Sequence, residues 1–361
     1  MFPRILLMLV VVGLLPSAAG AQPPKPTKKL IEFGWDEPDV AFLKRHLAEM
    51  EKTPFDGTVF HLPGEYLWNC WGKKKLSEAE VAGAIEDLRR LPLKRFTHNF
   101  LRFNVTPGDV DWFDDFAPVI ANARLAAKAA KAGRAAGILF DIEQYTGQPF
   151  NYSKQRDGKT KNWDAYAAQA RLRGREVMGA FQQEFSNVVI LTTWSHSLPH
   201  LQAKGDSAKL PQTGYGLLKP FLDGMFDAAS GGTKIVDGYE SSYGYRNAEQ
   251  FDAVRKRMKE TVLSWLPERD RYLRHSSQGF GIWLDNDWRK KGWSEIEVAK
   301  NYFTPEQFEA SVKSALATSD EYVWIYTEKP RWWTEPAGKP AALPAAYDRA
   351  LRRAAGREAP K

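Results

Sequence analysis

Two kinds of hydrophobic pattern alternate along the whole chain, one typical of strands and one typical of helices. Short apolar runs, such as GILFDIE at 137–143, have the length and composition of buried β-strands. Between them lie longer segments with apolar residues at helical spacing, such as 76–91, where Ser77 and Glu80 form a capping-box pattern. We therefore predict strands at 29–35, 57–62, 96–104, 137–143, 188–194, 235–241, 279–285 and 321–328.

A helical segment follows each predicted strand. We expect helices at 38–52 (with Pro38 in the first turn), 76–91, 114–132, 163–185, 215–229, 248–265, 305–317 and 345–355. Eight such units without a break in composition predict a single-domain α/β fold, a (β/α)8 TIM barrel, over 30–356. The alternative is an open doubly wound sheet, which would normally carry a glycine-rich phosphate turn after an early strand. None is present.

The first residues have the pattern of a secretory signal peptide. Arg4 precedes an apolar stretch at 5–15, and small residues follow at 19–21. We expect 1–21 to be removed by cleavage near Ala21, which predicts a secreted or periplasmic protein. The next segment, 22–29, reads as a flexible Pro/Lys linker. No other segment is long and apolar enough to predict stable membrane insertion after cleavage.

Composition narrows the classes of partner. Cys70 is the only cysteine, so no intrachain disulfide is possible, and no CxxC, HExxH or histidine cluster predicts a metal or other cofactor. The net charge of +7 is spread along the chain without a nucleic-acid-binding motif, so we expect no nucleic-acid partner. The chain has 13 tryptophans, several beside polar residues at strand ends. Aromatic rings in such places stack on sugars, which predicts a carbohydrate substrate.

Two carboxylates end the predicted fourth strand. Asp141 and Glu143 are two residues apart, so both point to one face of the strand, toward the barrel interior and its mouth. Barrel enzymes carry their sites at this end of the strands. A close pair of acids raises the pKa of one and keeps the other ionised, so Glu143 is the candidate general acid. The alternative is an ion pair in which an inward Arg102, on the third strand, neutralises them.

Other predicted strand ends carry further candidates. Asp285 after the seventh strand and Glu240 after the sixth are candidate nucleophiles or hydrogen-bonding groups. Asp36 is expected to cap the helix that follows the first strand. Residues near the mouth that are expected to bind substrate are Trp35, His61, Asn104, Tyr145, Trp194, Tyr239, Tyr243, Trp283, Trp324 and Tyr326.

The fourth-strand motif resembles the signature D-G-x-D-x-D-x-E of glycoside hydrolase family 18. Gly137, Asp141 and Glu143 match its glycine, last aspartate and glutamate, while Ala136 and Leu139 stand in place of its first two aspartates. The resemblance implies that Glu143 is the acid/base and that Asp141 orients a substrate acetamido group, which acts as nucleophile. Tyr239 or Tyr243 and Trp324 stand in places comparable to the family's sixth-strand tyrosine and eighth-strand tryptophan.

These patterns together predict a secreted glycoside hydrolase that cleaves O-glycosidic bonds of a poly- or oligosaccharide by acid/base catalysis. Two alternatives stay open, a non-catalytic carbohydrate-binding barrel and a lyase built on the same frame. An esterase is disfavoured because the chain contains no G-x-S-x-G turn to present a nucleophilic serine.

Overall fold

Parallel strands form the centre of the molecule in a computed structural model that describes residues 28–333 and 341–357. The predicted signal peptide, 1–21, and most of the predicted linker lie outside these residues, although the first strand already begins at Lys29. The strands are β1 (Lys29–Glu32), β2 (Gly57–Phe60), β3 (Phe100–Asn104), β4 (Gly137–Asp141), β5 (Val189–Thr192), β6 (Lys234–Asp237), β7 (Ser276–Gln278), β8 (Phe280–Trp283) and β9 (Tyr322–Tyr326).

These strands close into a ring. Each strand from β1 to β6 pairs with its neighbour in sequence, β1 also pairs with β9, and every pairing is parallel. Only Gly279 separates β7 from β8. Because β7 pairs with β6 while β8 pairs with β9, the two act as one interrupted strand that closes the barrel. The predicted (β/α)8 barrel is confirmed, and the open-sheet alternative is wrong.

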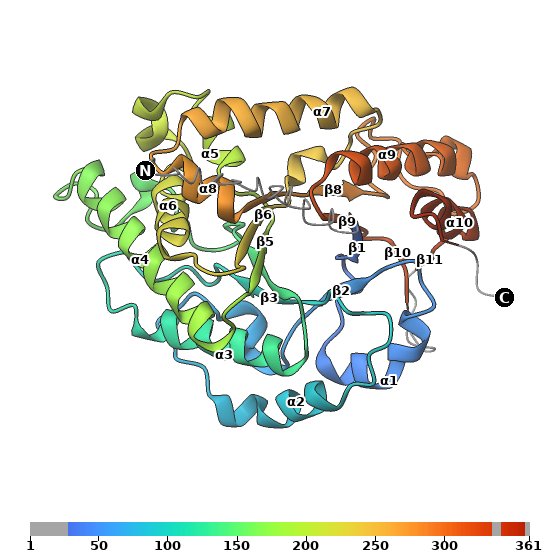
Figure 1. The fold of residues 1–361 in the computed structure, drawn as a ribbon, viewed down its shortest axis with the longest axis horizontal. Helices are drawn as coiled ribbons and strands as arrows, with labels where there is room; N and C mark the ends of the chain where they lie inside the picture. Colours follow the sequence, from blue (N-terminus) through green and yellow to red (C-terminus); the bar gives the residue numbers. More distant parts are fainter. Residues whose placement is uncertain (1–27, 334–340, 358–361) are drawn as a thin grey trace, which may run out of the picture.

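Helices surround the strands in Figure 1 and cover the outside of the barrel. They are α1 (Val40–Met50), α2 (Glu78–Arg90), α3 (Ala117–Ala132), α4 (Trp163–Glu184), α5 (Ser197–Gln202), α6 (Leu218–Ala228), α7 (Ala248–Arg257), α8 (Arg269–His275), α9 (Pro305–Thr318) and α10 (Ala345–Ala354). No helix among the described residues has both the length and the hydropathy needed to cross a membrane.

Local details differ from the sequence predictions. The short helices α5 and α8 were not predicted, and the helix expected over 248–265 ends at Arg257 and continues as a π-helical turn, Met258–Val262. Ser77 precedes α2, but its side chain makes no capping hydrogen bond. Helix α1 is capped by Asp39, which accepts the Phe42 amide at 2.7 Å, and not by Asp36; Pro38 therefore lies before the helix and not in its first turn.

The barrel has an inner and an outer hydrophobic core. Leu139 lies in the inner core, inside the ring, while Ile138, Phe140 and Ile142 belong to the outer core beneath the helices. This alternation follows from the two-residue period of a strand. It confirms the predicted orientation of β4, and the same alternation directs Asp141 and the residues after it toward the mouth.

Candidate active site

A pocket of about 700 Å³ opens at the carboxyl ends of the strands. Its lining comes from segments that follow β1, β2, β4, β5, β6 and β9, and from residues of β3, β8 and β9. Of the residues that the sequence predicted for the site, the pocket brings together Glu143, Glu240, Trp35, His61, Tyr145, Tyr243, Trp283 and Tyr326. The other lining residues are Phe33, Gly34, Glu37, Leu67, Trp68, Arg102, Thr193 and Glu328.

Arg102 crosses the pocket floor between two carboxylates. Its guanidinium lies 2.8 Å from Glu37 Oε2 and 2.6 Å from Asp141 Oδ2. Burial opposes the charge, but Glu37 and Asp141 outweigh it and raise the pKa of Arg102. Asp141 is fully buried, and its other oxygen accepts the Glu143 amide at 3.0 Å. For Asp141 the ion-pair alternative is therefore the arrangement found, and this carboxylate acts as a fixed support.

Glu143 keeps a carboxyl group directed into the pocket. Its side chain accepts a hydrogen bond from the Tyr145 hydroxyl, and no ion pair joins it to Arg102. Burial, followed by the negative charge of Asp141, raises the pKa of Glu143 to about 7, while Tyr145 and Arg102 act in the opposite direction. Glu143 therefore changes protonation near neutral pH, as a catalytic acid or base requires.

Glu240 lines the same pocket as Glu143, and the charge of Glu143 acts on its carboxyl. Burial, and then the charges of Glu143 and Asp141, raise the pKa of Glu240 well above its usual range. Its Oε2 atom is buried and has no hydrogen-bond partner. Two carboxyls that share a cleft without a cation between them cannot both ionise easily, so the pair retains a proton near neutral pH.

Backbone strain places Glu240. The residue before it, Tyr239, has φ 42° and ψ 61°, a left-handed conformation that is costly for a bulky residue. The carboxylate of Asp237, at the end of β6, accepts the Tyr239 amide at 3.1 Å and helps to hold this turn. The turn buries Tyr239 in the outer core and directs Glu240 into the pocket.

Aromatic rings form the pocket wall. Tyr243 stacks on Tyr326 with ring centres 5.6 Å apart, and Trp283 meets both rings edge-on. Across the pocket lining, Trp68 contacts Tyr145 edge-on at 5.7 Å. Sequence reasoning missed Trp68, which lies in the short helical turn after β2. Its position between a strand and the next helix, the place where barrel sites are built, was the available signal.

Four buried polar atoms of the pocket lining have no hydrogen-bond partner. They are Glu37 Oε1, Arg102 Nε, Thr193 Oγ1 and Glu240 Oε2. An unpaired buried polar group costs free energy that a ligand can recover by supplying the partner. Three of these atoms are oxygens, which a ligand that carries hydrogen-bond donors can satisfy.

Asp285 was expected at the pocket mouth, but it supports a loop. Its two carboxylate oxygens accept the amides of Glu328 and Lys329 at 3.0 and 2.9 Å, and Oδ1 also accepts the Trp283 indole N–H at 3.1 Å. It does not line the pocket. The strand ends at Trp283, two residues before the predicted end, and the amides after β9 enclose the carboxylate.

Four residues expected to bind substrate do not line the pocket either, because each is used by the fold. Asn104 bonds to the Leu67 carbonyl, the Trp194 indole donates to Ser241, and Tyr239 lies in the outer core. Trp324 is buried inside the barrel and donates to the Gly238 carbonyl at 2.9 Å.

Asp36, the expected helix cap, accepts the Trp332 amide at 2.7 Å instead. It ties the loop after β1 to the segment after β9. Within 28–333 and 341–357, no three His, Cys, Asp or Glu side chains are grouped so that they could hold a metal ion.

The chain matches no family model, and none of the curated proteins matches it. Among solved structures, it is similar to XacCel5A in complex with cellopentaose, with 12% identity, a TM-score of 0.44, and coverage of 91% of this chain and 99% of that one. An endocellulase from Pyrococcus horikoshii has 10% identity, a TM-score of 0.42 and coverage of 92% and 93%. A β-mannanase from the blue mussel Mytilus edulis has 10% identity and a TM-score of 0.42, and the match covers 91% of this chain and 92% of that one. These values are too low to bear on the reaction.

Proposed function

We propose that the protein is a glycoside hydrolase whose reacting groups are Glu143 and Glu240. The observation that carries this proposal is the pair itself: two carboxyls with raised pKa values line one aromatic-walled pocket, and neither forms an ion pair with a cation among the described residues. Glycosidic cleavage needs one protonated and one ionised carboxyl on either side of the scissile bond. The aromatic wall suits the apolar faces of sugar rings, and the unpaired oxygens suit their hydroxyls.

The surroundings of the two carboxyls assign their roles. Glu143 is stabilised as a carboxylate by the Tyr145 hydroxyl and by the charge of Arg102. Glu240 has only the Tyr243 hydroxyl to favour its ionised form, and its Oε2 is buried without a partner. The shared proton therefore resides on Glu240, which reverses the role that the sequence pattern suggested for Glu143.

In the proposed reaction, Glu240 donates its proton to the glycosidic oxygen as the bond from that oxygen to the anomeric carbon breaks. The leaving sugar departs as an alcohol. The Glu143 carboxylate meets the positive charge at the anomeric carbon, directly or through a water molecule. The net addition of one water restores the proton to Glu240 and gives the second product a free anomeric hydroxyl.

Asp141 supports this site without reacting. Its ion pair with Arg102 and its bond to the Glu143 amide leave it little freedom to orient a substrate acetamido group. The arrangement therefore favours the two-carboxylate route over the acetamido-assisted route implied by the resemblance to family 18. A secreted or periplasmic location belongs to the same proposal, and a mature protein that begins near Gln22 would support it.

The test is a screen of the purified protein against glucans, mannans, galactans and chitin oligomers, with released reducing ends as the readout. We expect one class to be cleaved by the wild type and to be cleaved far more slowly by Glu143→Gln and Glu240→Gln. Binding of a glycan without any cleavage would favour the carbohydrate-binding alternative. An unsaturated sugar in the product, visible by its ultraviolet absorbance, would indicate a lyase.

A further inference from the structure

A second pocket adjoins the candidate active site. It has a volume of about 370 Å³ and lies beside the loop after β1, where Arg45, Arg331, Asp36 and Asp39 supply its polar lining. Three residues, Trp35, Glu37 and His61, line both pockets. The two cavities therefore adjoin at these three residues.

Trp35 stands at the junction with its ring exposed. The side chain is 65% exposed, which is unusual for tryptophan, yet it is held in place. Its indole N–H donates to the Tyr326 hydroxyl at 3.0 Å, and the Arg331 guanidinium lies 5.8 Å from the ring centre. A fixed, exposed indole contributes little to the protein core, and it offers a flat surface on which a sugar ring can stack.

Glu37 supplies a polar anchor at the same junction. Its side chain is only 8% exposed, and one oxygen is held by Arg102, so the carboxylate is fixed in direction. The other oxygen, Oε1, is buried and has no partner. Because Glu37 lines both pockets, a hydroxyl of a sugar at the junction can satisfy this acceptor while its ring stacks on Trp35.

We propose that the pocket beyond Trp35 is a second sugar-binding subsite, and that the substrate is a chain of sugars that occupies both pockets. The identity of the ligand as a sugar rests on the proposed function. The mixed charges of this pocket, with arginines and carboxylates interspersed along its edge, suit hydrogen bonding to uncharged sugar units. The protein then acts on a poly- or oligosaccharide and not on a simple monosaccharide glycoside.

The test measures affinity against chain length in the full protein carrying Glu143→Gln, which prevents turnover. Gluco-, manno-, galacto- and chito-oligosaccharides, from disaccharide to hexasaccharide, are titrated by calorimetry. We expect affinity for the accepted series to rise with length until both pockets are filled. Adding Trp35→Ala should weaken binding of the longest oligosaccharide by about tenfold and flatten the dependence on length. Trp35→Phe keeps a ring and should preserve part of that dependence.

Two further variants serve as controls. Trp68 lines only the active-site pocket, so Trp68→Ala should weaken short and long oligosaccharides equally. Trp288 is also exposed but lines neither pocket, so Trp288→Ala should keep the full dependence on length. If the wild type cleaves a glycan but affinity is independent of length, or if the dependence survives Trp35→Ala, the subsite is refuted and the proposed function stands. If no glycan is bound or cleaved, both proposals fall.

Discussion

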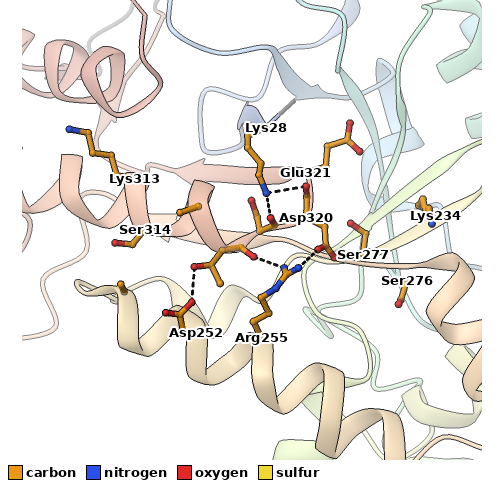
Figure 2. Close-up of a pocket in the computed structure, with 14 residues that line it drawn as sticks. Lys28, Lys234, Asp252, Arg255, Ser276, Ser277, Lys313, Ser314, Asp320 and Glu321 are labelled. Carbon is orange, nitrogen blue, oxygen red and sulfur yellow. Dashed lines mark hydrogen bonds and ion pairs between the residues drawn. The ribbon is translucent and has the colours of Figure 1, made fainter. Parts of the chain in front are cut away.

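The two ends of the barrel carry pockets of similar size but opposite character. The pocket at the amino ends of the strands, drawn in Figure 2, has a volume of about 850 Å³ and is the larger. It contains an ion pair, between Arg255 and Asp320 at 2.7 Å, and Thr318 donates a hydrogen bond to Asp252 at 3.2 Å. The described residues that line this pocket have no buried side-chain polar atom that lacks a hydrogen-bond partner.

The pocket at the carboxyl ends is smaller, yet four of its polar atoms are buried and unpaired. Each such atom costs about 1–3 kcal/mol. The charged side chains at the amino end are exposed or half-buried and do not carry this cost, so only the carboxyl-end pocket offers buried groups that a ligand can satisfy. Pocket volume does not distinguish the two ends, whereas the buried polar atoms without a partner do.

The largest effect that would separate the two ends is the loss of a reacting carboxyl. Glu143→Gln or Glu240→Gln should lower kcat on a confirmed glycan by a factor of about 10²–10⁴, because each removes a proton donor or a carboxylate. KM should change little, since the glutamine side chain has nearly the same shape as the glutamate that it replaces. At the opposite end, Arg255→Met should leave kcat nearly unchanged. An equal loss of kcat from Arg255→Met would contradict the assignment of the site.

The next effect concerns stability. Arg102→Met leaves Glu37 and Asp141 buried without their cation, so the free energy of unfolding should fall by about 3–5 kcal/mol. The pair Arg255–Asp320 is about one-third exposed, so Arg255→Met should lower stability by only about 0–1 kcal/mol. Urea unfolding of both variants measures the difference. Equal losses would mean that Arg102 does not neutralise two buried carboxylates at the pocket floor.

A smaller loss of stability should follow from Asp285→Ala. Two loop amides, of Glu328 and Lys329, lose their acceptor, which should lower the free energy of unfolding by about 1–3 kcal/mol. Because Asp285 lies outside the pocket, kcat should remain within about tenfold of the wild type, well above the loss that removal of a general acid or base causes. A loss of kcat as large as that of Glu143→Gln would restore Asp285 as a reacting group.

The smallest effect is a shift in pH dependence. Glu143 must be ionised, so kcat/KM should rise with pH through its pKa of about 7. The Tyr145 hydroxyl stabilises the carboxylate, and Tyr145→Phe therefore raises this pKa and moves the acidic limb upward by roughly 0.5–1 pH unit. A shift confined to the basic limb would return the role of proton donor to Glu143.

The sequence predicted the barrel well because hydrophobic periodicity reports directly on local structure. Alternation in 137–143 placed Leu139 inside the ring and Phe140 outside it, as the structure confirms. The predicted strand ends also indicated which residues reach the mouth of the barrel, and the pocket at the mouth is lined by Glu143, Tyr243 and Tyr326.

The sequence offered Arg102 as an ion-pair partner for the fourth-strand acids but did not decide between that role and catalysis, and it offered no partner for Asp285. Asp141 and Asp285 look like reactive carboxylates in isolation, but Arg102 holds one and the amides after β9 hold the other. The direction of Glu240 depends on a left-handed turn at Tyr239, which no periodicity encodes. Sequence spacing therefore identified the carboxylates at the strand ends, and tertiary contacts decide which of them are free to react.

In the proposed reaction, Glu240 donates the proton and Glu143 acts on the anomeric carbon. The most direct test compares the two glutamine variants on a glycoside with a poor alcohol leaving group and on one with a good phenolate leaving group, which departs without a proton. We expect Glu240→Gln to lose activity on the first substrate and to keep most of it on the second, whereas Glu143→Gln should lose activity on both. The opposite pattern would exchange the two roles, and full activity of both variants on both substrates would contradict the site itself.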